Sequence, residues 1–227
     1  MRGNLILRIV IILAIYFGLT YFGGEVGRKL LYPIRLFVTF LHEFGHAIGA
    51  VITGGWVEEV QINQDGSGWT KSANGNRSIT IMGGYLGSAI FGNLLFYVGA
   101  RTQKLVKPMM VLVILSMLVT GFYWFNSLFT TGVLVLFSLV LFFIAFKTNF
   151  GKEVLMFLGL ASVIYIIQDF NVGPTSDLKA YEEEMVFIPA QVWMYIWLGV
   201  AVLLLMFNLK MLLRKDPSDY DLNTQAP

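Results

Sequence analysis

Long apolar segments run through most of this chain and leave few architectures open to it. A helix needs roughly 20 apolar residues to cross the hydrocarbon core of a bilayer, and seven segments approach or reach that length. Only 13% of the residues are charged, against roughly 25% in soluble domains, which is too few to cover a soluble surface. We predict an all-α polytopic membrane protein with about seven transmembrane helices. The expected spans are residues 5–22, 33–53, 79–99, 108–125, 128–146, 155–169 and 189–213.

These spans are expected to form one integral membrane domain over residues 1–213. Residues 214–227 show no apolar period and predict a disordered tail. Most lysines and arginines fall on the side that the C-terminus shares, so the positive-inside bias predicts a cytoplasmic C-terminus, with the cell membrane as the expected location. The bilayer is therefore an expected partner. The net charge of +2 gives no reason to expect nucleic acid, and the sequence does not indicate an oligomeric state.

Two connections between spans carry distinct patterns. After the second span the chain turns polar, with apolar residues at Val57, Val60 and Ile62 and turn signals at Asp65-Gly66 and Asn74-Gly75. Such dipeptides suit the positive φ angles of tight hairpins, so we predict a small β-hairpin or three-stranded meander at the membrane surface, with a plain loop as the alternative. Between the sixth and seventh spans we expect a polar loop over residues 171–187.

Both histidines of the chain lie in the second span, in the sequence His42-Glu43-Phe44-Gly45-His46. Ionisable groups inside a membrane are costly and need partners. Residues four apart share one face of a helix, so both imidazoles can reach one zinc ion. Glu43 is rotated about 100° from His42, where it can accept a proton from a water held at the ion. The spacing predicts metal-assisted hydrolysis, with a structural histidine pair as the alternative.

A catalytic zinc site needs a third protein ligand, and the chain has no cysteine and no further histidine. Most acidic residues belong to expected surface segments. Asp169 lies 14 residues into the sixth span and His46 lies 13 residues after Pro33, so the rise of 1.5 Å per residue places both at roughly 20 Å depth. We therefore expect Asp169 as the third ligand. Asp177, which would have to fold back from the following loop, is the second choice.

The third span carries glycines and one asparagine. Gly83, Gly84, Gly87 and Ser88 form a face of small residues, which predicts close packing against the histidine helix. Asn93 is a polar group inside the same span. It is a candidate for contacting substrate, and the alternative is a hydrogen bond to a neighbouring helix.

The histidine motif in an apolar helix, the polar β region after it and the glycine-rich span with Asn93 resemble the site-2 protease family of intramembrane zinc metalloproteases, in particular its small members without a PDZ domain. The resemblance implies Zn²⁺ held by His42, His46 and Asp169, with Glu43 as general base. The usual Leu-Asp-Gly of the family is Gln168-Asp169-Phe170 in this chain.

The function that this resemblance implies is hydrolysis of a peptide bond in a membrane-spanning substrate helix. An unwound substrate could add as a strand to the hairpin edge near residues 57–63, so we expect Val60 and Ile62 to contact it. Two other functions stay open. One is a zinc-binding membrane scaffold that does not cleave, and the other is a small transporter.

Overall fold

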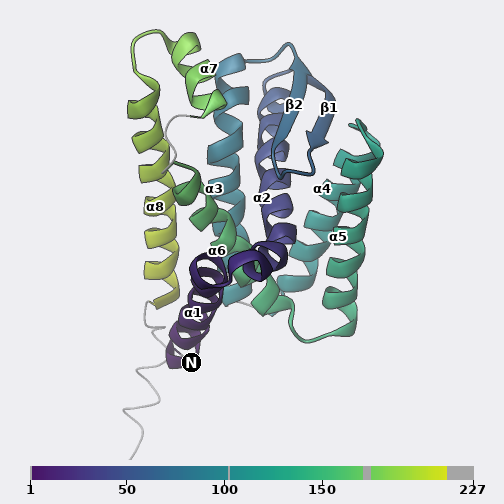
Figure 1. Ribbon diagram of the computed structural model, residues 1–227, viewed down its shortest axis with the longest axis vertical. Coiled ribbons are helices and arrows are strands. Elements are labelled where there is room, and N and C mark those ends of the chain that lie inside the picture. Colours follow the sequence, from purple (N-terminus) through teal and green to yellow (C-terminus); the bar gives the residue numbers. More distant parts are fainter. Residues whose placement is uncertain (1, 102, 171–174, 214–227) are drawn as a thin grey trace, which may run out of the picture.

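The computed structural model describes residues 2–101, 103–170 and 175–213, so the tail predicted for residues 214–227 lies outside the described residues. Helices dominate the described chain, and Figure 1 labels them in order. The elements are α1 (Arg2–Phe17), continued by a π-helical turn η1 (Gly18–Phe22), α2 (Gly24–Ile52), β1 (Trp56–Ile62), β2 (Gly68–Ala73), α3 (Arg77–Arg101), α4 (Val106–Phe122), α5 (Leu128–Lys147), α6 (Gly151–Phe170), α7 (Ser176–Met185) and α8 (Ala190–Leu213).

Helix α3 occupies the centre of the bundle and packs against α2, α6 and α8. Helices α4 and α5 form an antiparallel pair on the other side of α2 (Figure 1). Two main apolar clusters hold these layers. One joins α2 to α4 and α5 through buried side chains such as Phe37, Phe40 and Met117, and the other joins α3 to α7 and α8 around Trp197.

The contact between α2 and α3 is made by glycines, as the small-residue face predicts. A Cβ atom on Gly45 would overlap the Gly83 carbonyl oxygen, and one on Gly49 would lie 2.7 Å from the carbonyl oxygen of Ile79. The two backbones can approach this closely only because these positions carry no side chain. The close approach brings the histidine face of α2 against α3.

In the described part of the chain, five helices are long and apolar enough to cross a membrane: Asn4–Phe22, Arg77–Arg101, Leu128–Lys147, Gly151–Asp169 and Ala190–Leu213. The chain is thus an integral multi-pass membrane protein, but the predicted count of seven spans is not confirmed. Among the other helices, Val106–Phe122 is apolar but shorter, at 17 residues. The expected span 33–53 belongs to α2, which has 29 residues and carries several charged side chains.

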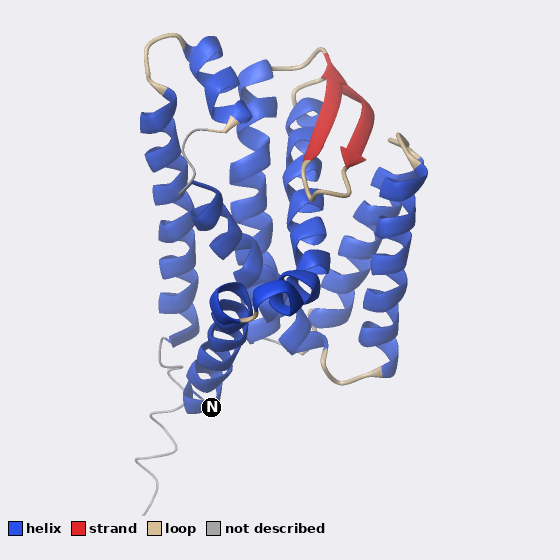
Figure 2. Ribbon diagram, viewed as in Figure 1, coloured by secondary structure: helices blue, strands red, loops and turns tan. Residues whose placement is uncertain are grey.

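The predicted hairpin is confirmed as a two-stranded antiparallel sheet of β1 and β2, drawn red in Figure 2. Gly66, Asn74 and Gly75 all have positive φ angles, as the turn signals require. The sheet does not sit beyond the end of the histidine helix. It lies alongside α2, and the hydroxyl of Thr70 on β2 donates a hydrogen bond of 2.8 Å to the Glu43 carboxylate. The strands therefore form one wall beside the motif.

The polar loop predicted over residues 171–187 contains helix α7, which is a correction to that prediction. Thr175 takes an extended backbone conformation at the N-cap position, and Asp177 supplies an acidic group in the first turn. Leu178 and Tyr181 lie three residues apart on one face of α7 and are both buried. They pack in the cluster around Trp197 of α8. This packing stabilises a short helix that its own sequence, only ten residues long, would not hold in isolation.

A candidate metal centre between α2, α3 and α7

The two histidines project from one face of α2, as their spacing predicts. Their Nε2 atoms lie 3.0 Å apart. The Nδ1 atom of His46 lies 2.8 Å from the backbone oxygen of Thr80 on α3, and a carbonyl can only accept. Nδ1 of a neutral His46 therefore carries the proton, which leaves the lone pair on Nε2 toward His42. Such a carbonyl partner commonly orients a metal-binding histidine.

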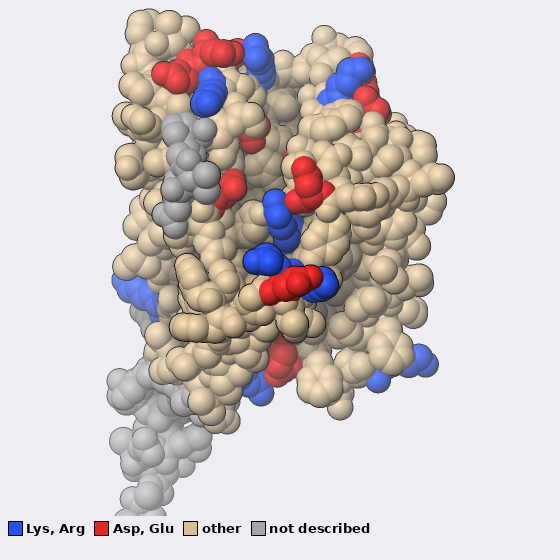
Figure 3. All heavy atoms as spheres, viewed as in Figure 1, with Lys and Arg blue, Asp and Glu red and all other residues tan. Residues whose placement is uncertain are grey.

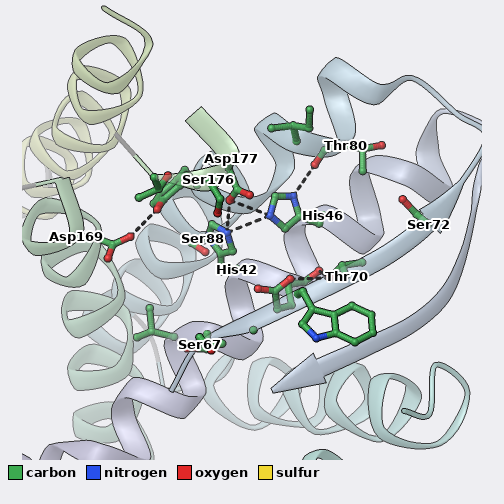
Figure 4. Close-up of a pocket in the computed structure, with 18 of the residues that line it drawn as sticks. His42, His46, Ser67, Thr70, Ser72, Thr80, Ser88, Asp169, Ser176 and Asp177 are labelled. Atoms are coloured by element: carbon green, nitrogen blue, oxygen red, sulfur yellow. Dashed lines mark hydrogen bonds and ion pairs between the residues drawn. The ribbon is translucent and has the colours of Figure 1, made fainter. Parts of the chain in front are cut away.

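Asp177, the second choice for the third ligand, takes the place beside the histidines. Its Oδ2 atom lies 2.8 Å from Nε2 of His42 and 3.2 Å from Nε2 of His46. Burial alone would raise the pKa of the Asp177 carboxyl, but the hydrogen bonds and charges of His42 and His46 outweigh it and hold that pKa well below its usual range. Figure 4 shows the three side chains converging on one point.

Asp169 does not join the histidines in this structure, which is a correction to the predicted ligand set. Asp169 lies outside the group of three, and its carboxylate instead accepts a hydrogen bond from the hydroxyl of Tyr85 (Figure 4). Asp169 lines the same cleft as the histidines, but its carboxylate points to Tyr85. Tyr85 stands between Asp169 and the histidines, because its hydroxyl bonds to Asp169 and its ring packs edge-on against His42 with 4.6 Å between ring centroids.

The donor set fits a metal ion. Two imidazole nitrogens and one carboxylate oxygen are a known zinc ligand set, and bonds of 2.0–2.1 Å in tetrahedral geometry place neighbouring donors about 3.3 Å apart. The three donor atoms here are separated by 2.8, 3.0 and 3.2 Å. A small movement outward would seat an ion between them. Three protein ligands would leave one tetrahedral position open, which is the arrangement of a catalytic zinc site.

Helix α3 leaves room for this group. A Cβ atom on Gly84 would lie 2.5 Å from Nε2 of His46 and 2.7 Å from Cε1 of His42. One turn further along α3, the Ser88 side chain is 1% exposed, and its hydroxyl has no hydrogen-bond partner among the described residues. Ser88 therefore adds a hydroxyl with free hydrogen-bonding capacity to the cleft that it lines.

Glu43 is 4% exposed and lies beside the group of three. The Thr70 hydroxyl donates to its Oε2 atom at 2.8 Å. A Cβ atom on Gly68 would come within 2.8 Å of its Oε1 atom, so this carboxylate is confined against β2. Thr70 holds one oxygen of Glu43 and leaves the other with accepting capacity.

One cleft of about 810 Å³ lies between α2, α3, α6, α7 and β2. Its walls include His42, Glu43, His46, Asp169 and Asp177. Figure 3 shows acidic and basic side chains near the centre of one face of the molecule as well as toward its two ends. A cleft with this lining is a polar chamber within a bundle whose remaining surface is largely apolar.

The structure does not bring the three predicted substrate contacts to this cleft, which is a correction. Asn93 is 3% exposed and bonds within the bundle, because its side-chain amide donates to Ala89 and its Oδ1 atom accepts from Asn208 of α8. Val60 and Ile62 are fully buried. Their N–H groups donate to the Trp124 carbonyl and the Thr130 hydroxyl, so the α4–α5 hairpin covers the outer edge of β1.

Two signals for the site are readable in the sequence but are easily overlooked. Arg35 and Thr39 stand 11 and 7 residues before His46, which continues the polar face of the histidines along α2. Thr175, Asp177 and Leu178 form the pattern of a helix start, with a cap, an acidic first turn and an apolar residue. The first signal indicates that the polar face of the histidine helix extends toward its N-terminus. The second indicates a helix that begins with an acidic residue after the sixth span.

A multi-pass helical bundle with a His-Glu-x-x-His helix and a third carboxylate at the two histidines is an arrangement typical of membrane-embedded metallopeptidases. A family model described as Peptidase M50B-like matches residues 6–208, and the chain therefore belongs to this family, the site-2 protease family of metallopeptidases. In the described part of the chain the only sheet has two strands, and no PDZ domain is found. No curated protein and no solved structure gives a significant match.

Proposed function

We propose that this protein is an intramembrane zinc metalloprotease that hydrolyses peptide bonds of membrane-spanning substrates. One observation carries the proposal. His42, His46 and Asp177 converge in the same cleft as the buried carboxylate of Glu43, within a chain of a metallopeptidase family. We further propose that the protein lies in the cell membrane with its C-terminus in the cytoplasm, as its charge distribution favours.

Three side chains would hold the ion and one would move the proton. A zinc ion on His42, His46 and Asp177 would supply Lewis acidity toward the scissile carbonyl. Glu43 accepts the proton of the attacking water and donates it to the departing amine. Thr70 keeps Glu43 oriented through its hydrogen bond to Oε2. The Thr80 carbonyl keeps His46 turned toward the ion.

The cleft-facing edge of β2 is the part of the sheet that can receive an extended substrate. Val60 and Ile62 point their backbone N–H groups away from β2, so the residues opposite them, Thr70 and Gly68, point theirs away from β1. No hydrogen bond among the described residues occupies these outward groups. We propose that an unwound substrate segment adds here as a third strand, beside Glu43.

The substitution Glu43→Gln tests this function. It keeps the shape of the side chain but removes its basicity, so the variant is expected to bind zinc with wild-type stoichiometry and to lose cleavage of co-expressed single-span substrates. Metal content of the purified protein and electrophoresis of the tagged substrates measure the two properties. Zinc binding by the wild type with no cleavage of any substrate would favour a scaffold, and full cleavage by the variant would remove Glu43 from the mechanism.

A further inference from the structure

A polar stripe runs along α2 below the metal centre. Arg35, Thr39, His42, Glu43 and His46 follow one another at spacings of four, three, one and three residues, which keeps them on one face of the helix. All five line the cleft. The metal group and Glu43 occupy the upper part of this stripe, and the proposed chemistry leaves Arg35 at its lower end without a role.

Arg35 stands where the charged start of α2 meets its buried apolar part. The next three residues, Leu36, Phe37 and Val38, are all buried. The Arg35 side chain is exposed toward the cleft that it lines. Its charge is therefore presented to the cleft and not to the apolar core.

The hairpin turn holds this guanidinium group in position. A Cβ atom on Gly66 would overlap the Arg35 side chain at Nε, so the arginine lies directly over the turn. Gly66 has a φ angle of +82°, which favours glycine there. Its carbonyl oxygen accepts a hydrogen bond of 2.7 Å from the buried Thr39 hydroxyl. The turn is thereby fixed to α2, and Arg35 is confined to the end of the cleft.

Among the described residues Arg35 forms no ion pair, unlike the other two cations that line the cleft. Lys71 pairs with Glu58 at 2.7 Å and Arg77 pairs with Glu184 at 3.6 Å. Among the described residues no carboxylate lies within ion-pair distance of Arg35.

Asp65 and Tyr165 interact electrostatically with Arg35, but neither forms an ion pair with it. Asp65 uses its Oδ1 atom to accept hydrogen bonds from Ser67, at 2.9 Å from the backbone N–H and 2.7 Å from the hydroxyl. Tyr165 of α6, which also lines the cleft and interacts with Arg35, offers a neutral hydroxyl. Among the described residues, the cleft thus contains a positioned cation with no carboxylate within ion-pair distance.

We propose that Arg35 forms a subsite for an acidic side chain of the substrate. This inference rests on the proposed function for the position of the cleaved bond. Arg35 precedes His42 by seven residues, or about 10 Å along the helix, and an extended chain covers about 3.3 Å per residue. The acidic residue would therefore lie about three residues from the cleaved bond, on one side of it. The protease would select membrane segments with an aspartate or glutamate at that spacing.

A reversal of charge tests the subsite. The zinc-loaded wild type and the variants Arg35→Glu and Arg35→Gln are purified in detergent and given a synthetic peptide library randomised around an apolar centre. Mass spectrometry then identifies the cut positions. The wild type is expected to enrich acidic over basic residues about fivefold at one position two to four residues from the cut. Arg35→Glu should invert this preference, and Arg35→Gln should abolish it.

A matched control is Arg28→Glu, which reverses an exposed charge on the same helix outside the cleft lining and should keep the wild-type profile. Equal zinc content and equal melting temperature show that the variants are folded. Identical cleavage profiles in the wild type and in Arg35→Glu would overturn the subsite.

A binding measurement separates this inference from the proposed function. Two labelled peptides that differ only by aspartate or lysine at the selected spacing are titrated into the zinc-loaded Glu43→Gln variant, with and without Arg35→Glu. If the wild type cuts no peptide but binding still follows the charge of residue 35, the protease assignment fails and the subsite stands. Binding that ignores the charge overturns the subsite even where cleavage is observed.

Discussion

The Asp177 carboxylate lies 2.8 Å from Nε2 of His42, although 135 residues separate them in the chain. Helix α7 makes this contact by starting a new helix soon after α6 ends and by anchoring Leu178 and Tyr181 against α8. The first turn of α7 therefore faces the histidines. The metal centre depends on the packing of this short helix as much as on the motif in α2.

Substitution of the two candidate acids should separate their roles. Asp177→Asn is expected to lower zinc affinity by roughly 100-fold or more, because it removes a charged donor at the two histidines. Loss of a residue that only hydrogen-bonds to a metal ligand already lowers metal affinity by roughly 10–100-fold. Asp169→Asn should keep zinc at wild-type stoichiometry, because its carboxylate bonds to Tyr85 instead. Competition with a zinc-sensitive dye measures both affinities. Loss of zinc in Asp169→Asn alone would restore Asp169 as the ligand.

Gly84 should be intolerant of a methyl group. In Gly84→Ala the new Cβ would lie 2.5 Å from Nε2 of His46, so the rings must shift and zinc affinity should fall. Gly199→Ala on α8 is the matched control, because its Cβ meets no atom within 4 Å. The control should be neutral or slightly stabilising, since alanine favours a helix over glycine by about 1 kcal/mol. Zinc titration and thermal unfolding in detergent check both variants, and equal zinc affinity would show that α3 does not confine the rings.

Asn93 should act as a packing residue. Asn93→Ala and Asn208→Ala are each expected to lower the free energy of unfolding by about 0.6 kcal/mol and by at most about 1.7 kcal/mol, the average and the maximum for hydrogen bonds between membrane helices. Because the two side chains bond directly at 3.0 Å, the double variant should lose less than the sum of the single losses. Unfolding in mixed micelles provides the three values. A changed cleavage position in Asn93→Ala would return this residue to the substrate site.

The Thr70 hydroxyl should matter for turnover more than for substrate binding. Thr70→Val keeps the shape of the side chain but removes the hydrogen bond to Glu43, and bonds to charged groups contribute about 1.5–3 kcal/mol. We expect kcat to fall about tenfold or more at nearly constant KM, with Thr70→Ser retaining most activity. Steady-state cleavage kinetics of one substrate measure the three proteins. Equal losses in the valine and serine variants would indicate a packing role for Thr70.

The features predicted correctly depend on neighbouring residues. The apolar runs predict a multi-pass helical bundle, the dipeptides Asp65-Gly66 and Asn74-Gly75 predict a hairpin, and the glycines of α3 predict close packing. Each of these features depends on residues that are close in sequence, within one helix or turn or at one contact between helices. The predicted count of seven spans is not confirmed, because α2 mixes apolar residues with charged ones and does not reach the hydropathy of a membrane span.

The sequence by itself determined that two imidazoles and one glutamate share a helix turn inside a membrane protein, because helical periodicity alone places them there. Only the tertiary structure decided which acid completes the site and which strand edge faces it. Asp169 and Asp177 are eight residues apart, and the start of α7 between them reverses which carboxylate points inward. Likewise the α4–α5 hairpin covers β1, so β2 and not Val60 or Ile62 lines the cleft. These outcomes depend on how distant helices pack, and no local pattern contains that information.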